Sequence, residues 1–563
     1  MVSPSVWRIG SSGRCEDEAD VRRDRMSAET SSASSITRSV AVASAIMMTS
    51  VMLSRILGIV REMVLASYGG TRSEMDAYVA SFLLPEIVNH LLAGGFMSVT
   101  FIPIFQRHLA QNRRDLAWKA FSNLITTGSL VIAVLTGLCL VFTESILGLM
   151  GRHITDPHQL ALTARMTRII LPAQIFFYWG ALLLAVQYAE KRFFIPALAP
   201  LIYNAGIILG GVVLSPFIGI EGFAWGVLGG SFLGNFVVQA LGARASGLAF
   251  RWRCEWRDPD LRRYVLVTVP LVAGLGMQFS TEVFFRYFGS FLGPGGLASL
   301  NYALRTMMAL VAVFGQAFGV AAFPFLSQYV AEKRYREMNT LLFSMISKVA
   351  VIMIPFSLLM MVLSRETVAL IFQRGRFTEA STQATAPVLI MYCLGAFGLA
   401  ATNMVSRGFY AVQNTVLPMI VSSLAAFFSL PLYWFFLQQS GAPGIALVGS
   451  LGMIGQFVVL MWLWTKRYQG GPELHRLLVM MGKVVAISAI GCALCLGIAA
   501  GLDRMTMVHG LRTSLRSALV LGASGIPAAL LIFLVFDRLG IADFRAIISR
   551  LLRKKERGTG KTP

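Results

Sequence analysis

Long apolar runs, separated by short breaks that carry charges, glycine or proline, dominate the chain. The stretches 130–142 and 349–363, for example, contain almost no polar side chain. Many of the runs reach about 20 residues, the length that an α-helix needs to cross roughly 30 Å of hydrocarbon. The pattern therefore predicts an all-α polytopic membrane protein and argues against a soluble multidomain enzyme.

The positions of the breaks predict about fourteen transmembrane helices. The expected spans are 39–66, 77–105, 119–142, 163–187, 195–215, 220–242, 264–288, 297–328, 341–363, 384–407, 415–436, 443–465, 477–501 and 514–537. Composition agrees with this prediction: 56% of the residues are hydrophobic and only 14% are charged, whereas soluble chains carry about 25% charged residues.

The distribution of charge predicts an orientation. The 49 Lys and Arg residues exceed the 28 Asp and Glu residues, giving a net charge of +21. Arginine and lysine gather in the loops at 107–114, 191–192, 244–263, 333–336 and 466–476, and the loops near 219, 293 and 440 are almost uncharged. The positive-inside rule places both termini in the cytoplasm, which requires an even number of spans. Cationic loops that face an anionic leaflet also explain the net charge better than a nucleic-acid partner does.

The two ends of the chain are polar. Residues 1–38 contain no apolar core of a signal peptide and are expected to form a disordered cytoplasmic leader. Residues 543–563 are expected to form a basic cytoplasmic tail. The six cysteines are scattered and suggest no disulfide framework.

Several short motifs recur in the same order along the chain. Residues 101–105 resemble 322–326, and 143–146 resemble 365–368; the spacing from Tyr188 to Pro196 recurs from Tyr410 to Pro418. The three offsets agree to within a single position. We therefore expect two six-helix lobes in parallel orientation, with residues 39–243 in the N-lobe and 264–466 in the C-lobe. In transporters built this way the substrate binds between the repeats. Two further spans in 476–538 lie outside the repeat and are assigned to covering a lipid tail.

The first span contains ionisable residues, which cost at least ~2.5–3.5 kcal/mol in lipid and usually face a cavity or a partner. Arg55 and Glu62 share one helix face, and Arg61 lies about 240° from Arg55. A bend at Gly58 would let both arginines face one cavity. The functional hypothesis is a cationic site for phosphate; alternatively, Arg61 and Glu62 mark the aqueous end of the helix.

The second span carries Asp76 at its entry and a polar stripe formed by Glu86, Asn89 and His90. These side chains are three and four residues apart, just after Pro85, on one face of a kinked helix, so they are expected to line a wet cavity. Whether His90 relays protons or is only hydrogen-bonded is left open by the sequence.

In the second lobe, Arg305 has no acidic neighbour in its own span and is the strongest candidate for a second contact with an anion. Glu282 and Arg286, one helical turn apart, are expected to pair with each other. The glycines at 226, 230 and 234 form two overlapping GxxxG patterns, which predict close helix packing.

No catalytic signature is present. The sequence has no Walker A motif, no HExxH motif and no metal-ligand spacing. We therefore expect neither an enzyme nor a cofactor. Transport would be secondary and would draw on an ion gradient or on the membrane potential.

Several segments resemble the MurJ (MviN) family, the lipid II flippases of the multidrug/oligosaccharidyl-lipid/polysaccharide exporter superfamily. The resemblance runs from about residue 40 to about residue 540 and is carried by residues 54–62, 76–77, 84–85, 101–104, 192–197, 375–378, 408–410 and Pro418.

The resemblance implies a V-shaped pair of lobes, a central cationic cavity and a groove for a polyprenyl tail formed by the two last spans. It implies transfer of lipid II from the cytoplasmic to the periplasmic leaflet of a bacterial inner membrane by alternating access. The residues assigned to substrate binding are Arg55, Arg61, Arg305, Asn89 and His90, and those assigned to gating or coupling are Asp76, Glu62, Glu86 and Gly58.

The chain also departs from the family pattern at cavity positions. Asn89 and His90 stand where many members have a basic pair, and Leu83 stands where they have a basic residue; Gly94 and Met308 replace acidic residues. A paralogue that moves another polyprenyl-pyrophosphate-linked glycan is therefore an alternative. A scaffold of cell-wall assembly that does not transport is another, with membrane lipids and cell-wall synthesis proteins as its partners.

Overall fold

The computed structural model describes residues 47–92, 96–150, 156–314, 325–468, 470–504 and 513–541, leaving aside the side chains at 92, 96–99, 149–150, 270–282 and 503. Every regular element in these ranges is helical, which confirms the all-α prediction. The predicted leader 1–38 and tail 543–563 lie outside the described residues.

The first half of the chain forms what we call the N-terminal bundle. It begins with a helix at 47–69. Its further helices are α2 (Ser73–Ser81), α3 (Leu83–Leu92), α4 (Phe96–Ala110), α5 (Arg114–Val141), α6 (Thr143–Met150), α7 (Pro157–Ile170), α8 (Ala173–Ala189), α9 (Phe194–Ile218), α10 (Glu221–Ser231), the π-helical turn η1 (Phe232–Val237) and α11 (Val238–Ala245).

The second half forms what we call the C-terminal bundle, followed by peripheral helices. The elements are α12 (Pro259–Gly289), α13 (Gly296–Phe314), α15 (Tyr335–Val362), α16 (Ser364–Phe372), α17 (Glu379–Ala411), α18 (Val416–Tyr468), α19 (Gly471–Arg504), α21 (Thr513–Val520), η2 (Leu521–Gly525) and α22 (Ile526–Arg538). α18 is two helices joined at Gly441, whose backbone is non-helical (φ 59°, ψ −129°). That break lies between the predicted spans 415–436 and 443–465.

In the described residues, ten helices are long and apolar enough to cross a membrane, counting α18 once. The prediction of a polytopic helical protein is thus confirmed, whereas the number of fourteen spans stays a prediction. The helix at 47–69, the broken run α2–α4 and α12 lie at the other predicted positions.

Local sequence explains where several helices begin. The carboxylate of Asp156 accepts a hydrogen bond from the backbone N–H of His158 at 2.9 Å, directly before Pro157 opens α7. Asp258 likewise accepts from the N–H groups of Asp260 (2.8 Å) and Leu261 (3.2 Å), before Pro259 opens α12. An acidic N-cap followed by proline is a strong start signal, because proline lacks the N–H that a first helical residue leaves unpaired.

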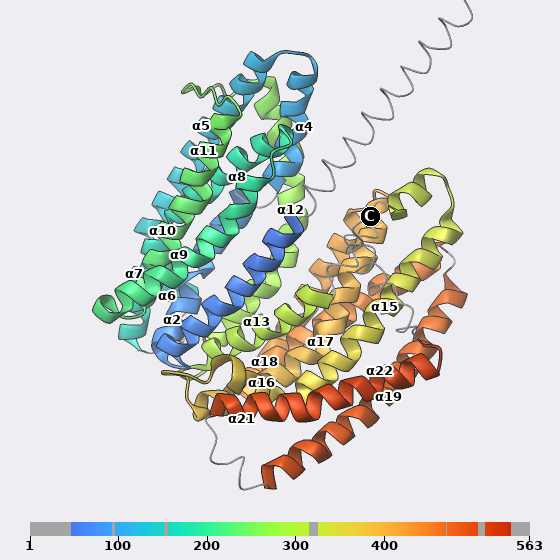
Figure 1. Ribbon diagram of the computed structural model, residues 1–563. Helices are drawn as coiled ribbons and strands as arrows, with labels where there is room; N and C mark the ends of the chain where they lie inside the picture. The colour runs from blue at the N-terminus through green and yellow to red at the C-terminus, as the bar shows by residue number, and fades with distance from the viewer. Residues whose placement is uncertain are drawn as a thin grey trace, which may run out of the picture.

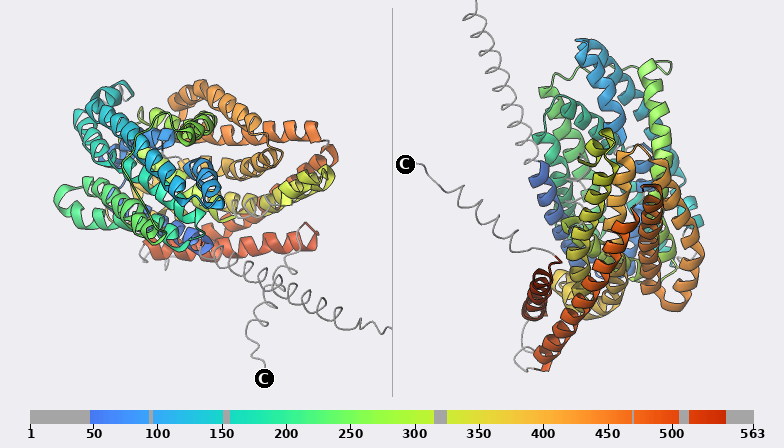
Figure 2. Two further views of the ribbon diagram at one scale, coloured as in Figure 1. Left: turned by 90° about the horizontal axis from the view of Figure 1, so that it is seen from above. Right: turned by 90° about the vertical axis from the view of Figure 1, so that its right-hand side faces the viewer.

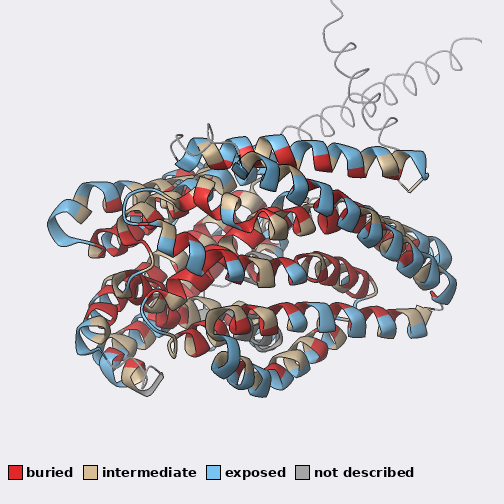
Figure 3. Cartoon of the chain, turned by 90° about the horizontal axis from the view of Figure 1, so that it is seen from below, coloured by how far each residue is buried: buried red, intermediate tan, exposed pale blue. Residues whose placement is uncertain are grey.

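The two bundles approach each other at one end and diverge towards the other (Figure 1). α2 and α13 lie at the end where the bundles meet. The peripheral helices α19 and α22 pack on the outer side of the C-terminal bundle, as the side view of Figure 2 also shows. Buried residues face the inside of the bundles, and exposed residues cover the outer sides and the peripheral helices (Figure 3). Many of these exposed residues are apolar, for example Leu478, Ile490 and Leu530, as expected of surfaces that contact lipid.

α12 belongs to both bundles. Near its start, Asp260 accepts hydrogen bonds from Arg107 (2.6 Å) in α4 and pairs with His108 (2.7 Å). Near its end, the ring of Phe288 stacks on Tyr433 in α18, with 5.0 Å between centroids. The helix therefore crosses from the N-terminal to the C-terminal bundle.

The glycine pattern in α10 packs closely against α9. A Cβ added at Gly226 would lie 2.8 Å from the carbonyl oxygen of Gly206 and 2.9 Å from the Cα of Ile207, and one added at Gly230 would lie 2.8 Å from the carbonyl oxygen of Tyr203. These distances confirm the predicted close packing, which only glycine permits.

Gly226→Ala is expected to lower the stability of the purified protein by about 1–3 kcal/mol, because the added methyl group must push two backbones apart. Gly229→Ala is the matched control, since a Cβ at Gly229 meets nothing within 4 Å. Thermal unfolding in lipid nanodiscs measures both. Equal melting temperatures for the two variants would contradict the role assigned to Gly226.

Candidate functional site

The two bundles are joined through a carboxylate from α2. Asp76 Oδ2 accepts a hydrogen bond from the backbone N–H of Gly295, and Oδ1 accepts one from Ala298, both at 2.6 Å. These N–H groups belong to the start of α13, whose helix dipole also favours a negative charge there. Asp76 is only 4% exposed, so a side chain of one bundle caps a helix of the other in a site closed to solvent.

Backbone contacts surround this cap. The N–H of Arg376 donates to the carbonyl oxygen of Ser67 at 2.8 Å, and the Tyr302 hydroxyl donates to the carbonyl oxygen of Gly70 at 3.2 Å. Gly70 and Gly295 have positive φ (59° and 83°), and a Cβ on either would lie within 2.5 Å of a carbonyl oxygen in the opposite bundle. We call the contacts of residues 67–76 with 295–302 and 375–381 the inter-bundle seal.

A polar cavity of about 260 Å³ lies between the bundles, further along α13 from the seal. Arg305 lies seven residues beyond Ala298, which is about 10 Å along the helix. The lining residues come from nine helices and the turn at Phe82; they are Arg61, Glu62, Leu65, Tyr78, Val79, Phe82, Pro85, Glu86, Asn89, Ile170, Gln174, Phe177, Tyr203, Val227, Arg286, Asn301 and Arg305.

Two of the three arginines in the cavity are paired. Arg61 donates to Glu62 at 2.6 Å and to the side-chain oxygen of Asn204 at 3.0 Å. Arg286 forms a two-pronged ion pair with Glu86 of α3, with one N···O distance of 2.8 Å. Arg286 is only 3% exposed, so its charge depends on this partner. The cavity lining holds three guanidinium groups and two carboxylates, a formal excess of one positive charge.

Arg305 supplies that excess. Within the described ranges no ion pair and no hydrogen bond of its side chain is found, and its buried Nε has no partner. Other buried polar atoms of the lining are also unpartnered there, namely Arg61 Nε, Glu62 Oε2, Gln174 Oε1 and Arg286 Nε. A guanidinium group binds phosphate oxygens through two parallel N–H groups. The cavity can therefore accept an anionic group at Arg305 with neutral and charged donors around it.

The structure brings together five of the nine site residues chosen from the sequence: Arg61, Glu62, Glu86, Asn89 and Arg305 line the cavity. Asp76 lies in the seal. The other three do not line the cavity: Arg55, Gly58 and His90.

The reasons for these three placements are local. The helix at 47–69 is unbroken through Gly58, so Arg55 stays on a different side from Arg61 and the two do not share this cavity. His90 Nδ1 lies 3.2 Å from the carbonyl oxygen of Glu86, one turn back on its own helix.

The structure pairs Arg286 with Glu86, a partner that the sequence did not predict, and the expected pairing with Glu282 is not tested. The side chain of Glu282 lies outside the described residues. Residues one turn apart on a helix are neighbours, but a carboxylate from another helix that allows two parallel hydrogen bonds is a stronger partner. Glu86 and Arg286 are 200 positions apart, and no local signal in the sequence could reveal their contact.

Glu86→Gln is expected to lower stability by about 3–5 kcal/mol, because it leaves the Arg286 charge buried without a counter-charge. The double variant Glu86→Gln/Arg286→Met removes both charges and should recover most of that loss. Thermal unfolding of the two single variants and the double variant gives the coupling energy. Additive effects would show that the two side chains do not act as a pair.

The described part of the chain is all-helical, with ten membrane-length apolar helices, a polar cavity between two bundles and a seal at one end. These features place the protein in the class of multi-pass membrane proteins. Within this class the chain belongs to the MurJ family: residues 65–515 match the family model described as Lipid II flippase MurJ.

Individual relatives agree with this assignment. The chain is 27% identical over 465 residues to a "Probable lipid II flippase MurJ" of Bdellovibrio bacteriovorus, covering 79% of this chain and 87% of the relative. It is 25% identical over 513 residues to a "Lipid II flippase MurJ" of Burkholderia cenocepacia, covering 88% and 96%.

The fold is shared with solved structures. A structure titled "Lipid II flippase MurJ, inward closed conformation" superposes with a TM-score of 0.71 at 23% identity, covering 88% of this chain and 99% of the other. An inward-facing multidrug resistance MATE family transporter of the MOP superfamily gives a TM-score of 0.62 at 14% identity, covering 75% and 98%. The similarity at these identities concerns the fold alone.

Proposed function

We propose that this protein flips lipid II, the lipid-linked peptidoglycan precursor, from the cytoplasmic to the periplasmic leaflet of a bacterial inner membrane. The observation that carries the proposal is the Arg305 guanidinium, which has no partner within the described ranges and lies in a polar cavity between the two bundles. A pyrophosphate linker is the part of such a substrate that a guanidinium group in the cavity recognises. The MurJ family assignment supports lipid II as the substrate.

The proposed mechanism is alternating access. The seal holds the bundles together at one end by the Asp76 cap on α13, and Arg376 of this seal belongs to a loop on the predicted periplasmic side. The bundles diverge at the other end (Figure 1), where the cationic loops are predicted to face the cytoplasm together with both termini. The substrate would enter from the cytoplasmic side, and opening of the seal would release it to the periplasm. Asp76 thereby acts in gating, and the transport is secondary.

The proposal includes an internal duplication and fourteen spans. α5 and α15 have the same length and begin at positions 114 and 335, and α9 and α18 begin at positions 194 and 416. Positive-φ turns follow at Gly219 and Gly441. The three offsets agree to within a single position, and they equal the offset of the recurring sequence motifs. This agreement supports two six-helix lobes at 39–243 and 264–466, with Gly441 dividing α18 into two spans.

The last two spans, within 476–538, are proposed to hold the polyprenyl tail. α19 and α22 contact each other and α15. Their outward surfaces carry exposed leucine, isoleucine and valine side chains, such as Val485, Leu494 and Leu534. An apolar surface outside the repeat suits a long hydrocarbon chain that stays in the bilayer while the polar head crosses.

Another polyprenyl-pyrophosphate-linked glycan is the second candidate substrate. It is favoured by Asn89, a neutral amide that lines the cavity. The family resemblance implies a basic residue at this position in many members. A lower positive charge in the cavity suits a head group with fewer acidic groups.

Complementation tests the function. Expression of the chain in a strain depleted of its own lipid II flippase should restore growth and clear the lipid-linked precursor from the cytoplasmic leaflet. Reconstituted vesicles with labelled lipid II or with another labelled polyprenyl-linked glycan then identify the substrate. Failure to move either lipid would contradict the proposal and favour the scaffold alternative.

A further inference from the structure

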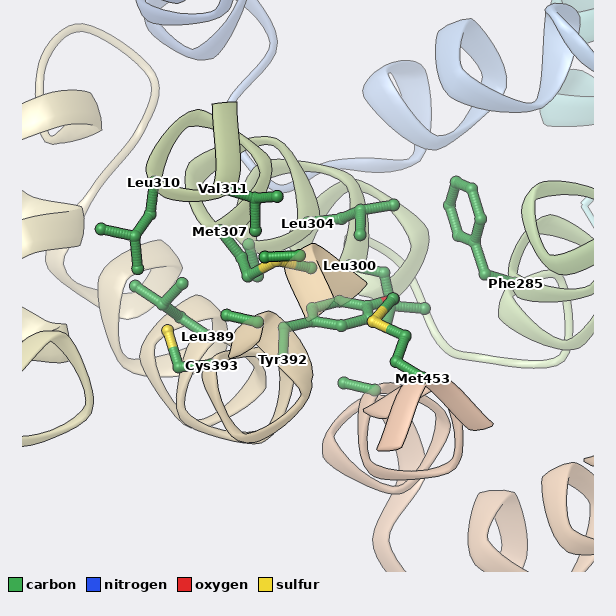
Figure 4. Packing of buried hydrophobic residues seen from close by; sticks show 14 of the residues in the cluster. Phe285, Leu300, Leu304, Met307, Leu310, Val311, Leu389, Tyr392, Cys393 and Met453 are labelled. Carbon is green, nitrogen blue, oxygen red and sulfur yellow. The ribbon is translucent and has the colours of Figure 1, made fainter. Parts of the chain in front are cut away.

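A second cavity of about 220 Å³ lies inside the C-terminal bundle. Its described lining contains no charged residue; it consists of Phe285, Leu304, Met308, Tyr392, Leu399, Thr402, Asn403, Ser422, Ala425, Ala426, Ser429, Tyr433, Val448, Gly449, Gly452, Met453 and Gln456. We call it the neutral cavity. Figure 4 shows part of its wall, where Tyr392 extends from α17 towards Met453 of α18 beside Leu304 of α13.

α12 and α13 separate the neutral cavity from the cationic one. On α13, Arg305 lines the cationic cavity, and Leu304 and Met308 line the neutral cavity. On α12, Arg286 lines the first cavity and the preceding Phe285 lines the second. The two cavities are thus neighbours that share one wall.

Polar side chains of the neutral cavity are available for a ligand. In the described part of the chain, the side chains of Asn403, Ser422, Gln456, Tyr392 and Tyr433 make no hydrogen bond with the protein. Tyr392 and Tyr433 are each only 2% exposed. Asn403, Ser422 and Gln456 are partly exposed, and none of the five side chains has a fully buried unpartnered atom in the described residues, so their polar atoms remain accessible. Amides and hydroxyls together can both donate and accept hydrogen bonds.

The chemistry of this lining selects an uncharged partner. A charged group would lose its hydration and meet no counter-charge. A hydrocarbon chain would leave the five polar side chains without partners. The volume is below the roughly 300–1,000 Å³ of sites for drug-sized ligands, so the cavity suits a group of about one sugar ring. Two tyrosines and Phe285 provide apolar surface for the face of such a ring.

We propose that the neutral cavity binds an uncharged sugar ring bearing hydroxyl and amide groups, of the N-acetylated kind. This proposal rests on the proposed function, because such a ring would belong to the glycan whose pyrophosphate meets Arg305.

The test uses the full chain in lipid nanodiscs. The probe is a disaccharide of N-acetylglucosamine without phosphate or lipid, of which one ring would occupy the cavity, and saturation-transfer NMR measures its binding. Asn403→Leu/Gln456→Leu keeps the side-chain size but removes both amides, and it should weaken disaccharide binding at least tenfold. Gln438→Leu is the matched control, since Gln438 is exposed and lies outside the cavity. It should bind the disaccharide like the unmodified protein.

Inorganic pyrophosphate, titrated in parallel, separates this proposal from the proposed function. The double variant should bind pyrophosphate normally, and Arg305→Ala should bind the disaccharide normally but lose pyrophosphate. If the unmodified protein binds pyrophosphate but shows no saturable binding of the disaccharide, the neutral cavity holds water only and the inference is overturned. Equal disaccharide binding by the double variant and the unmodified protein would overturn it as well.

Discussion

Arg305→Ala is expected to reduce the initial rate of lipid flipping in reconstituted vesicles by about 10- to 150-fold. The arginine is the one guanidinium of the described cavity lining that has no carboxylate partner, so the variant removes the charge available to a pyrophosphate. Hydrogen bonds to charged groups contribute about 1.5–3 kcal/mol, which corresponds to this range of affinity. Because no ion pair is broken, the melting temperature should stay within a few degrees of the unmodified protein.

Arg165→Ala is the matched control for this variant. Arg165 is 57% exposed and pairs with Glu221 at 3.1 Å on the protein surface, where such pairs contribute about 0–1 kcal/mol. Its flipping rate should be nearly unchanged, and Arg305→Lys should retain part of the activity because it keeps the charge but loses the two-pronged geometry. Full activity of Arg305→Ala would refute the role of the cationic cavity in substrate binding.

Asp76→Asn is expected to open the inter-bundle seal in a large fraction of molecules. The carboxylate accepts two backbone hydrogen bonds at the start of α13, and an amide retains one acceptor oxygen and no charge. The loss of about 1–3 kcal/mol shifts the equilibrium between sealed and open states by roughly 5- to 150-fold. Spin labels at the exposed positions Arg72 and Thr378, one in each bundle, should show a longer distance by double electron–electron resonance.

Glu74→Gln is the matched control for Asp76→Asn, because it neutralises an exposed carboxylate of the same seal instead of a buried one. Glu74 pairs with Arg376 across the same seal at 3.2 Å, but both side chains are about half exposed (42% and 53%). Solvent screens this pair, so its loss should leave the label distance nearly unchanged. If Glu74→Gln opens the seal as far as Asp76→Asn does, the helix cap is not the contact that holds the bundles together.

The sequence alone predicts the helices well, because span length and apolar content depend on the membrane and need no knowledge of tertiary contacts. Gly441 illustrates this point: the loop near it was expected from a local change in polarity, and the backbone turns there. Arg61, Glu86 and Arg305 could be chosen as cavity residues for a similar reason, since ionisable groups are costly in lipid.

Contacts between distant residues could not be predicted. The pairing of Arg286 with Glu86 and the capping of α13 by Asp76 depend on how two bundles meet, and the partners are far apart in the sequence. Arg55 shows the converse problem. Helical periodicity gives the angle between the side chains of Arg55 and Arg61 around the helix axis. Only the packing of the whole bundle decides which of the two side chains faces the cavity.

α12 has a mechanical consequence for any transport cycle. One end is fastened to α4 by Asp260, and the other is stacked on Tyr433 of α18, so this helix tethers the two bundles that the proposed alternating access moves relative to each other. Such a tether has to flex along its length or release one anchor at every turnover. The sequence between the anchors contains Pro270, Gly274 and Gly276, residue types at which helices bend easily. In the proposed transport cycle, α12 is therefore expected to bend between its two anchors and to limit how far the bundles can separate.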